Sequence, residues 1–323
     1  QLMMVMWVKA ETPYAWTGSD TVLIPKPAGD PTEIKNKRPI ALANTLYKLW
    51  TSLITACTAA HSPAARLFSD GQEAYRAQKN TERMIHCLLN VISDAALTQQ
   101  DLFVTYIDFS SAFNTIDHDC LLRVMYDMGL PLDLIEVVRN LYSTARTSIR
   151  TEHGRTPDIP IERGTVQGDT LSPILFIIFI EPLLRWLHHG GRGYRFGCLS
   201  AQASDRHNLS SGCYADDIAV CTNTISDMRV QAEKIERYAA WAGLRVNTSK
   251  CVLTGILHRQ ASSSNEFGTT TTGKHYAKRL RSMMEGQIKI NGVAIPYQPP
   301  SKAYPYLGVR VALTLDWGEQ MAT

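Results

Sequence analysis

Paired cysteines, a strong net charge and a secretion signal are all lacking from this sequence. The 323-residue chain has seven cysteines, and no two of them form a Cys-x-x-Cys pair. This argues against a zinc site or a disulfide framework and is typical of a reduced, intracellular protein. The formal net charge is only +3, so a nucleic-acid partner is permitted but not implied, and any cationic surface must be local. No signal peptide, lipidation signal or internal repeat is recognisable.

Long uncharged hydrophobic runs are lacking too. A strongly apolar stretch at residues 171–187 contains Pro173, Glu181, Pro182 and Arg185. It is also shorter than the roughly 20 predominantly apolar residues that cross a bilayer. We therefore expect a buried helix with Pro173 near its first turn, and no membrane partner.

The composition that remains is that of an ordinary globular protein, with 45% hydrophobic and 20% charged residues. Such a length suits one large domain or two to three subdomains that share a core. Because the chain begins at Gln1 without a methionine, we expect it to be part of a longer protein.

Apolar periodicity and turn residues predict a mixture of helices and strands. The expected caps of three of the helices are Asn44, either Asn80 or Thr81, and Asp227. The expected helices cover residues 46–60, 81–96, 118–128, 131–141, 171–187 and 228–242. The expected strands cover residues 21–24, 39–42, 102–109, 213–215, 218–221, 251–253, 287–290 and 306–311, with a hairpin at 149–161. The polar segment 258–285 is expected to be a flexible insertion.

Three aspartates lie at the ends of predicted strands. Asp108 is near the end of strand 102–109, whose apolar run suits a central strand covered on both faces. Asp216 and Asp217 lie at the tip of a hairpin, where two adjacent acids are also typical of a solvated turn. If the hairpin packs beside the Asp108 strand, the acids form an oxygen-rich cluster suited to Mg²⁺. Two such ions about 4 Å apart can activate a 3′-hydroxyl and stabilise a pyrophosphate leaving group.

A basic loop between the first two predicted strands is the second feature of interest. Its four cations are Lys26, Lys35, Lys37 and Arg38. Most such charge clusters are solvated loops. The functional alternative is a flap whose cations meet the phosphates of an incoming triphosphate.

Taken together and in order, the motifs resemble those of the reverse transcriptase domain of non-LTR (LINE-type) retrotransposons. The resemblance covers residues 22–311. The matching segments are 23–26 with 37–42, 71–76, 106–113, 167–173, 214–217, 243–251 and 306–309. Each match alone is weak evidence, whereas the occurrence of all of them in the family's order is specific to that family.

The resemblance implies roles for particular residues. Asp108, Asp216 and Asp217 would be the catalytic carboxylates that hold two Mg²⁺ ions, with Mn²⁺ as a substitute. Lys250 would assist pyrophosphate departure, although a plain surface lysine is an equal alternative. The residues implied in nucleotide binding are Lys26, Arg38, Phe109, Phe113 and Gln167. The residues implied in the primer grip are Tyr306, Leu307 and Gly308.

Phe113 matches the aromatic residue that lies under the sugar and excludes a 2′-hydroxyl, which favours deoxynucleotides. A plain core aromatic is the alternative for this side chain. The sequence departs from the family at Asn114, where aspartate is common, and at Val166, where a basic or small residue is usual. Both departures leave open a decayed copy, although neither removes a proposed metal ligand.

The implied fold is α+β, a right-hand polymerase with fingers and an antiparallel palm sheet backed by helices, and with the thumb largely missing. The expected divisions are 1–107 (N-terminal extension and fingers), 108–257 (palm, with part of the fingers possible within 130–165), 258–285 (the insertion) and 286–323 (primer-grip hairpin and start of the thumb).

The implied function is RNA-directed DNA polymerase activity in retrotransposition. The partners would be an RNA template, a DNA primer and dNTPs, and the nucleus would be the place of action. The alternatives are a catalytically inactive nucleic-acid-binding remnant, a group II intron-type maturase and an RNA-dependent RNA polymerase. Phe113 counts against the last two, and the three intact aspartates count against the first.

Overall fold

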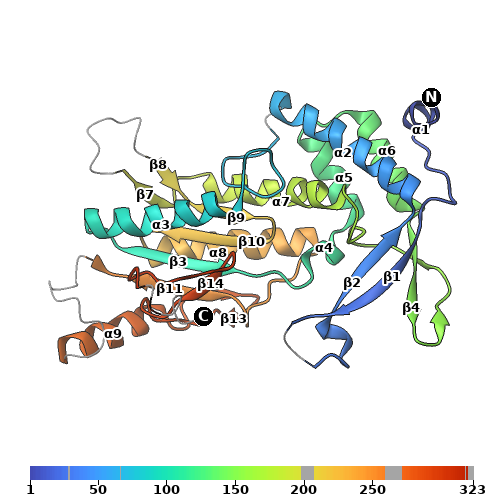
Figure 1. Ribbon diagram of the computed structural model, residues 1–323. Coiled ribbons are helices and arrows are strands. Elements are labelled where there is room, and N and C mark those ends of the chain that lie inside the picture. Colours follow the sequence, from blue (N-terminus) through green and yellow to red (C-terminus); the bar gives the residue numbers. More distant parts are fainter. Residues whose placement is uncertain (28–29, 66, 198–206, 259–270, 317, 319–323) are drawn as a thin grey trace. The chain divides into compact units, whose positions relative to one another are not determined.

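The chain folds into two compact units (Figure 1), and the computed structural model describes all residues except 28–29, 66, 198–206, 259–270, 317 and 319–323. Unit 1 comprises Gln1–Phe68 and Ser111–Ile180, and unit 2 comprises Ser69–Ser110 and Glu181–Thr323. The divisions expected from the sequence follow one another along the chain, whereas the structure has each unit built from two separate segments. In particular, Asp108 belongs to unit 2 and Phe113 to unit 1.

Unit 1 contains a sheet in the order β2-β1-β4-β5, with β6 also paired to β4. The strands are β1 (Gly18–Pro25), β2 (Lys37–Ala43), β4 (Arg146–Thr151), β5 (Gly154–Arg155) and β6 (Ile159–Pro160). β1 and β2 form an antiparallel pair, and β1 lies parallel to β4. The two predicted strands around the basic loop are therefore confirmed, as is the hairpin beyond residue 149.

The helices of unit 1 begin and end largely where the capping residues predict. The Asn44 side chain accepts a hydrogen bond from the backbone N–H of Leu46 at 2.8 Å and begins α2. Asp117 caps α5 through the N–H of Cys120, and Gly129 follows its end with φ of 78°. The helical segments are α1 (Leu2–Lys9), η1 (Ile34–Asn36), α2 (Thr45–Ala65), α4 (Ala112–Thr115), α5 (His118–Asp127) and α6 (Leu132–Ser143).

Helix α7 (Ser172–His188) begins in unit 1 and ends in unit 2. The predicted buried helix is confirmed, because its apolar side chains from Leu175 to Ile180 are fully buried. In the part of the chain that the structure describes, no helix combines the length and apolarity needed to cross a membrane.

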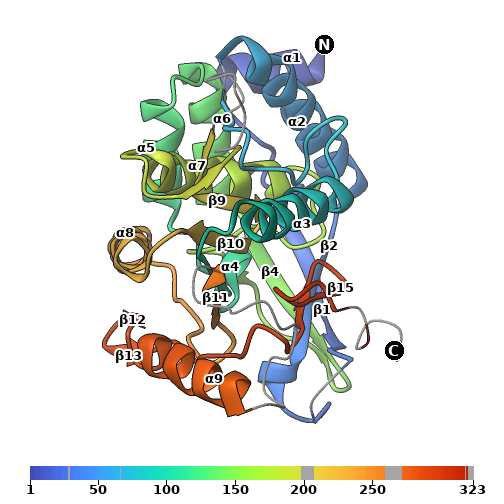
Figure 2. The same cartoon turned by 90° about the vertical axis from the view of Figure 1, so that its left-hand side faces the viewer.

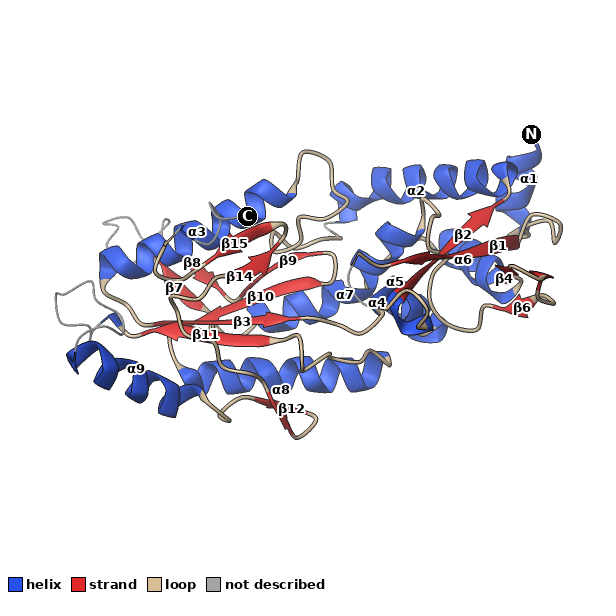
Figure 3. Ribbon diagram, turned by 60° about the horizontal axis from the view of Figure 1, so that its bottom comes forward, coloured by secondary structure: helices blue, strands red, loops and turns tan. Residues whose placement is uncertain are grey.

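Unit 2 is built on an antiparallel sheet in the order β11-β3-β10-β9, whose strands lie side by side in Figure 3. The strands are β3 (Leu102–Ile107), β9 (Ser211–Tyr214), β10 (Asp217–Thr222) and β11 (Val252–Ile256). Every residue of β3 is buried, as expected for a central strand covered on both faces. An antiparallel sheet backed by helices therefore carries Asp108 and the Asp216–Asp217 pair.

Helices cover both faces of this sheet: α3 (Thr81–Thr98) lies on one side and α8 (Ile225–Ala242) on the other (Figure 2). Side chains alternate between the faces of a strand. Leu102, Val104 and Tyr106 of β3 accordingly share one apolar cluster with Met84 and Leu88 of α3. Of the two expected caps of α3, Asn80 is the one found: its side chain accepts a hydrogen bond from the N–H of Arg83, and Thr81 is the first residue of the helix.

The remaining elements of unit 2 differ from the sequence expectations in three places. Thr224, not Asp227, caps α8, and Asp227 lies in the first turn of the helix. The segment 258–285 includes a helix, α9 (Thr271–Met284), rather than being flexible throughout, while residues 259–270 lie outside the described part. The expected strand 306–311 is a hairpin that turns at Leu307 and Gly308, both with positive φ. The short strands are β7 (Tyr194–Phe196), β8 (His207–Leu209), β12 (Lys289–Ile290), β13 (Val293–Ala294), β14 (Tyr304–Tyr306) and β15 (Val309–Val311).

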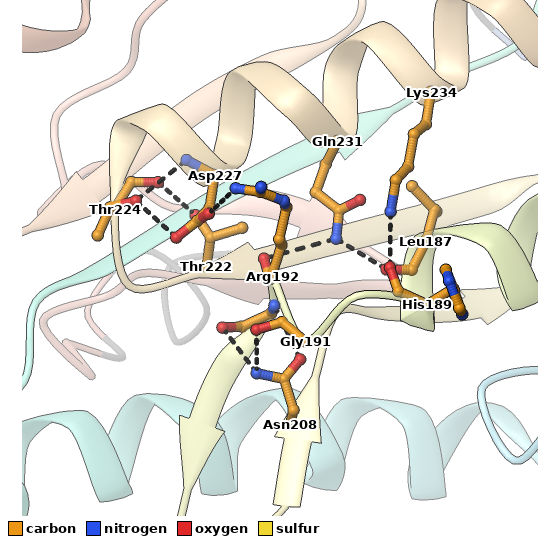
Figure 4. A network of polar contacts seen from close by, with 11 residues as sticks. Leu187, His189, Gly191, Arg192, Asn208, Thr222, Thr224, Asp227, Gln231 and Lys234 are labelled. Atoms are coloured by element: carbon orange, nitrogen blue, oxygen red, sulfur yellow. Dashed lines mark hydrogen bonds and ion pairs between the residues drawn. The ribbon is translucent and has the colours of Figure 1, made fainter.

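Helix α8 also satisfies the carbonyl groups at the C-terminal end of α7 (Figure 4). Lys234 donates to the carbonyls of Trp186 and His189 at 2.7 and 2.9 Å, and Gln231 donates to that of Leu187 at 2.9 Å. The last carbonyls of a helix have no partner within it, and a cation there also complements the helix dipole. These two buried side chains therefore fix α8 against the end of α7.

Candidate active site

The β9–β10 hairpin presents Asp216 and Asp217 at its tip. Tyr214 pairs with Asp217, so only Ala215 and Asp216 form the connecting loop. Ala215 has a φ of 58°, a backbone conformation that a residue with a Cβ rarely adopts. The two-strand prediction is confirmed, but no local pattern indicates the left-handed alanine.

Asp108 lies at the same end of the sheet as this tip. Ile107 pairs with Ile218 in the antiparallel β3–β10 ladder, so Asp108 and Asp217 are the next residues on the two neighbouring strands. The Asp108 backbone is fixed on both sides: its N–H donates to the Cys251 thiol sulfur at 3.4 Å, and its carbonyl accepts from the N–H of Asn247 at 2.8 Å. The hairpin therefore packs beside the Asp108 strand, the condition on which the predicted acid cluster depends.

The electrostatics of this cluster disfavour its ionised form. Burial raises the pKa of Asp216 to about 6, helped by the neighbouring charges of Asp217 and Asp108. Desolvation, followed by the Asp108 charge, also raises the pKa of Asp217, although that residue keeps contact with solvent. None of the three carboxylates forms an ion pair with a described cationic side chain. The cluster thus has the donor set and the uncompensated charge of a site for hard divalent cations.

The carboxylates are neighbours at this sheet end, yet they do not converge on one point. Across the described residues, no group of three or more His, Cys, Asp or Glu side chains is gathered closely enough to hold a metal ion as it stands. Mutual repulsion between the acids favours such separation. A bound cation would offset this repulsion.

The motif at residues 71–76 lies against the same hairpin. Gln72 and Cys213 form a parallel bridge, in which the N–H of Cys213 donates to the Gly71 carbonyl at 2.8 Å and the N–H of Glu73 donates to the Cys213 carbonyl at 3.0 Å. The following Tyr75 lies near Asp216, whose charge adds to burial in raising the pKa of the Tyr75 hydroxyl. The sequence resemblance placed this motif in the fingers; the structure places it in unit 2 beside the aspartates.

The β14–β15 hairpin brings a further tyrosine to the cluster. Tyr304 stacks on Tyr106 with ring centroids 4.0 Å apart. Burial raises the pKa of Tyr304 to about 12, with further contributions from the charges of Asp108 and Asp217. Of the predicted primer-grip residues, Tyr306 is buried in the core while Leu307 and Gly308 form the turn. No local pattern indicates Tyr304 as a site residue, because its position depends on the β14–β15 hairpin.

Lys250 and Phe109 flank the cluster in unit 2 with different exposures. Lys250 is exposed at the end of the turn that begins at Asn247, and its N–H donates to the Asn247 carbonyl. Phe109 is buried, with 4% of its surface exposed, and its backbone bridges to Val246. Phe109 is therefore a core side chain next to Asp108.

Phe113 lies in unit 1 together with the loop that contains Gln167, here called the Gln167 loop. Phe113 is half-buried and stacks on Phe176 of α7, with ring centroids 4.3 Å apart. Its carbonyl accepts from the N–H of Thr165 at 2.8 Å, which fixes the start of the loop. At the other end of the loop, the Gln167 carbonyl accepts from the N–H of Ala41 in β2 at 2.7 Å. The loop thus connects Phe113 to the strand that carries Arg38.

The predicted phosphate-binding cations lie on the β1–β2 hairpin of unit 1. Arg38 is exposed and pairs in register with Ile24, and Lys26 is exposed just beyond the end of β1. Lys26 is held by its backbone N–H, which donates to the Asn36 carbonyl at 2.8 Å.

Asp169 is a loop residue that the sequence reasoning missed. It is buried, and it accepts hydrogen bonds from the Thr51 hydroxyl and from the N–H of Thr170. Burial raises the pKa of Asp169 to about 6 despite these donors. Asp169 thereby connects the Gln167 loop to α2, and its burial and its contact with Thr51 become visible only in the structure.

An antiparallel sheet that carries carboxylates at one strand end and on the adjacent hairpin is compatible with the metal-assisted chemistry of a nucleotidyltransferase. The comparison with family models is specific: the model described as "Reverse transcriptase (RNA-dependent DNA polymerase)" matches residues 24–311. The chain belongs to this family. Its members generally use divalent metal ions.

Two relatives of the chain come from non-LTR retrotransposons. The chain is 24% identical over 233 residues to the Pol polyprotein of the R2 element of Bradysia coprophila, an alignment that covers 72% of this chain and 25% of the relative. It is 23% identical over 310 residues to the RNA-directed DNA polymerase of the mobile element jockey of Drosophila melanogaster, covering 94% of this chain and 29% of the relative. The chain thus spans about a quarter of the length of these relatives.

Solved structures show the same fold. Apo telomerase from Candida tropicalis aligns with a TM-score of 0.55 at 15% identity, over 77% of this chain and 46% of the telomerase chain. A form truncated from its C-terminal domain aligns with a TM-score of 0.53 at 14% identity, over 78% of this chain and 52% of the other. The predicted α+β fingers–palm fold is therefore confirmed.

Proposed function

We propose that this chain is the polymerase module of a longer non-LTR retrotransposon protein and that it extends a DNA primer on an RNA template. The observation that carries the proposal is the meeting of Asp108 with the Asp216–Asp217 hairpin at one end of the unit 2 sheet. Family membership over residues 24–311 and the retrotransposon relatives support it.

Asp108, Asp216 and Asp217 are the residues that would hold the divalent cations. When bound, Mg²⁺ or Mn²⁺ would lower the cost of ionising the primer 3′-hydroxyl and stabilise the departing pyrophosphate. The protein contributes the fixed Asp108 backbone and the short hairpin, which position the carboxylates in advance. Exposed Lys250 is proposed to supply positive charge near the departing pyrophosphate.

Unit 1 is proposed to supply the contacts to the incoming dNTP. Lys26 and Arg38 carry the charge that phosphates require, and the guanidinium of Arg38 can bind a phosphate through two parallel hydrogen bonds. The half-buried ring of Phe113, held by Phe176, suits the exclusion of a 2′-hydroxyl. Gln167 is the proposed contact to the base pair, and the Leu307–Gly308 turn the proposed contact to the primer.

The template class is proposed from the relatives and from the chemistry of the family. A related telomerase structure contains a fragment of telomeric RNA, a property of that protein. Action in the nucleus stays a prediction that accompanies the retrotransposon assignment.

Primer extension tests the proposal directly. The chain would be incubated with an RNA template, an annealed DNA primer, dNTPs and Mg²⁺, beside the Asp216→Asn variant. We expect extension by the wild type and a loss of at least about a hundredfold in the variant, because one carboxylate ligand is removed. Equal, negligible incorporation by both proteins would instead support an inactive nucleic-acid-binding remnant. A parallel reaction with ribonucleotides and a Phe113→Ala variant tests the sugar filter.

A further inference from the structure

A closed ring of hydrogen bonds surrounds Ala215, the residue immediately before Asp216. The N–H of Ala215 donates to Gln72 Oε1 at 3.1 Å, the Gln72 amide Nε2 donates to Cys213 Sγ at 3.4 Å, and the Cys213 thiol donates to the Ala215 carbonyl at 2.9 Å. Both backbone polar groups of Ala215 are therefore bound by two side chains. We call Gln72, Cys213 and Ala215 the Ala215 lock.

The directions of these hydrogen bonds follow from chemistry. Gln72 Oε1 also accepts from the N–H of Ala74 at 3.0 Å. A backbone N–H can only donate, so the oxygen of the Gln72 amide must face both of these groups and its nitrogen must face the sulfur. With the sulfur accepting from that nitrogen, its own proton is available for the Ala215 carbonyl. The ring thus has one consistent arrangement of donors and acceptors.

Burial makes the lock specific to these side chains. Gln72 and Cys213 each have 0% of their surface exposed, so water cannot replace a missing partner without opening the core. An unpaired polar group at such a depth is strongly disfavoured. Burial also keeps the Cys213 thiol protonated, since it raises the pKa of this group well above its usual value.

The lock acts on a strained backbone. A positive φ is disfavoured for alanine because its Cβ approaches the backbone carbonyl, and such residues persist only where their surroundings hold them. Ala215 has a φ of 58°, and its conformation sets the direction in which the next residue leaves β9. Gln72 and Cys213 compensate for this strain by binding both polar groups of the residue.

We propose that Gln72 and Cys213 are positioning residues for the polymerase reaction, which hold Asp216 in its reactive orientation by locking Ala215 in a left-handed conformation. The inference rests on the proposed function, because the orientation of Asp216 matters through the cations it would hold. Neither side chain touches the substrate in this account.

Four variants, namely Cys213→Ala, Gln72→Met, Cys213→Ser and Cys221→Ala, separate a positioning role from ordinary packing. Cys213→Ser keeps a donor for the Ala215 carbonyl, and Cys213→Ala removes it. Cys221 offers a matched control because it is buried on β10 of the same sheet and lies outside the lock. We expect Cys213→Ala and Gln72→Met to lower kcat at least about tenfold with the primer–template Kd unchanged, while Cys213→Ser and Cys221→Ala stay within about threefold of the wild type.

A rescue experiment addresses the strain itself. Glycine adopts a positive φ without steric cost, so Ala215→Gly should depend less on the lock. We expect the double variant Gln72→Met/Ala215→Gly to have a kcat at least about threefold higher than that of Gln72→Met alone. A Gln72→Met protein with wild-type kcat, or a Cys221→Ala protein as slow as Cys213→Ala, would overturn the inference.

Amide hydrogen exchange at Ala215 provides a readout independent of polymerase activity. We expect slow exchange in the wild type, at least about tenfold faster exchange in Gln72→Met, and no change in Cys221→Ala. If primer extension fails for the wild type while this pattern holds, the proposed function is wrong and the lock is real. If exchange at Ala215 is equally fast in all three proteins, the lock is wrong whatever the activity.

Discussion

At the scale of single residues, Asp216 illustrates how a group of neighbouring carboxylates lowers the stability of the folded protein. Its pKa in the folded protein is about 6, above the ordinary value of 3.8, because burial and two neighbouring acids disfavour its charge. The folded protein therefore holds an extra proton between these two values. It loses stability as the pH rises through this window, and the loss persists at neutral pH.

We expect Asp216→Asn to stabilise the protein at pH 7 in the absence of divalent cations. After a discount for solvent screening, the expected gain is about 1–2 kcal/mol in the free energy of unfolding, and it should vanish below about pH 4. Urea unfolding at both pH values measures it. Asp127→Asn, at an exposed ion pair with Arg123, is the control and should stay within about 0.5 kcal/mol. Equal changes in the free energy of unfolding in the two variants would contradict the interpretation that burial and the neighbouring acids make the charge of Asp216 destabilising.

The same raised pKa makes cation binding depend on pH. Mg²⁺ binds the ionised carboxylate, so protonation of Asp216 competes with it below about pH 6. We expect the half-saturating Mg²⁺ concentration, measured by thermal shift, to rise up to about tenfold per pH unit as the pH falls below that value. In Asp216→Asn the Mg²⁺-dependent thermal shift itself should be lost, because the variant lacks this carboxylate. A half-saturating concentration that is flat between about pH 5 and pH 7 in the wild type would argue against Asp216 as a ligand.

At the scale of elements, the Gln167 loop depends on a close approach of backbones. Gly164 has a φ of 80°, and a Cβ there would overlap the backbone of Asn114 in α4, which follows Phe113. Gly129 has a similar φ of 78° but open space around it. Alanine substitutions at Gly129 and Gly164 therefore separate two contributions to the loss of stability. Gly129 reports the strain of a left-handed backbone alone, and Gly164 adds the overlap with α4.

We expect Gly129→Ala to cost about 1 kcal/mol of stability from backbone strain alone, and Gly164→Ala to cost about 2–4 kcal/mol because α4 must also move. Chemical denaturation of the two variants provides the comparison. Since α4 carries Phe113, the Gly164 variant should also discriminate less well between dNTPs and ribonucleotides. Similar destabilisation by both variants would show that the loop can shift away from α4 at little cost.

Sequence reasoning located most elements because their signals are local. Asn44, Asn80 and Gly129 begin or end helices by contacts within one turn, and the apolar run of β3 indicates a covered strand from composition alone. The failures involve contacts between segments distant in sequence. The chain reverses at Leu307–Gly308, and the resulting hairpin packs on Tyr106, a contact to which no local pattern points.

In the candidate site, too, features with local signals could be predicted and those that depend on distant contacts could not. The placement of the three aspartates at the ends of strands could be predicted because adjacent acids and a strand-end acid are visible in the sequence, and the register of β3 with β10 brings them to the same end of the sheet. The Ala215 lock could not be predicted, since Gln72 lies more than 140 residues away from Cys213 along the chain. A buried glutamine carries no signal until its partners are known.

At the scale of the whole molecule, the chain crosses between the units at residues 68, 110 and 180. Local signals cannot reveal such interleaving, because an element has the same pattern whichever unit it joins. A functional consequence follows from the resulting partition. All three candidate cation ligands belong to unit 2, whereas Lys26, Arg38, Phe113 and Gln167 all belong to unit 1.

This partition leads to different expected responses to the cation and to the nucleotide. Mg²⁺ alone should slow hydrogen exchange in unit 2, at β3 and at the β9–β10 hairpin, because it offsets the repulsion between carboxylates there. The β1–β2 hairpin and the Gln167 loop of unit 1 should not respond. Adding a dNTP with a chain-terminated primer on an RNA template should then protect these unit 1 segments as well.

The Asp216→Asn variant separates the two events. Its unit 2 should lose the response to Mg²⁺, while unit 1, whose proposed phosphate-binding cations are unmodified, should retain weak, salt-sensitive protection by the nucleotide. Protection of unit 1 by Mg²⁺ alone would mean that the cation binds away from the aspartates. Protection of unit 2 only, under every condition, would remove Lys26, Arg38, Phe113 and Gln167 from the nucleotide site and leave the carboxylate cluster as the sole part of the assignment that stands.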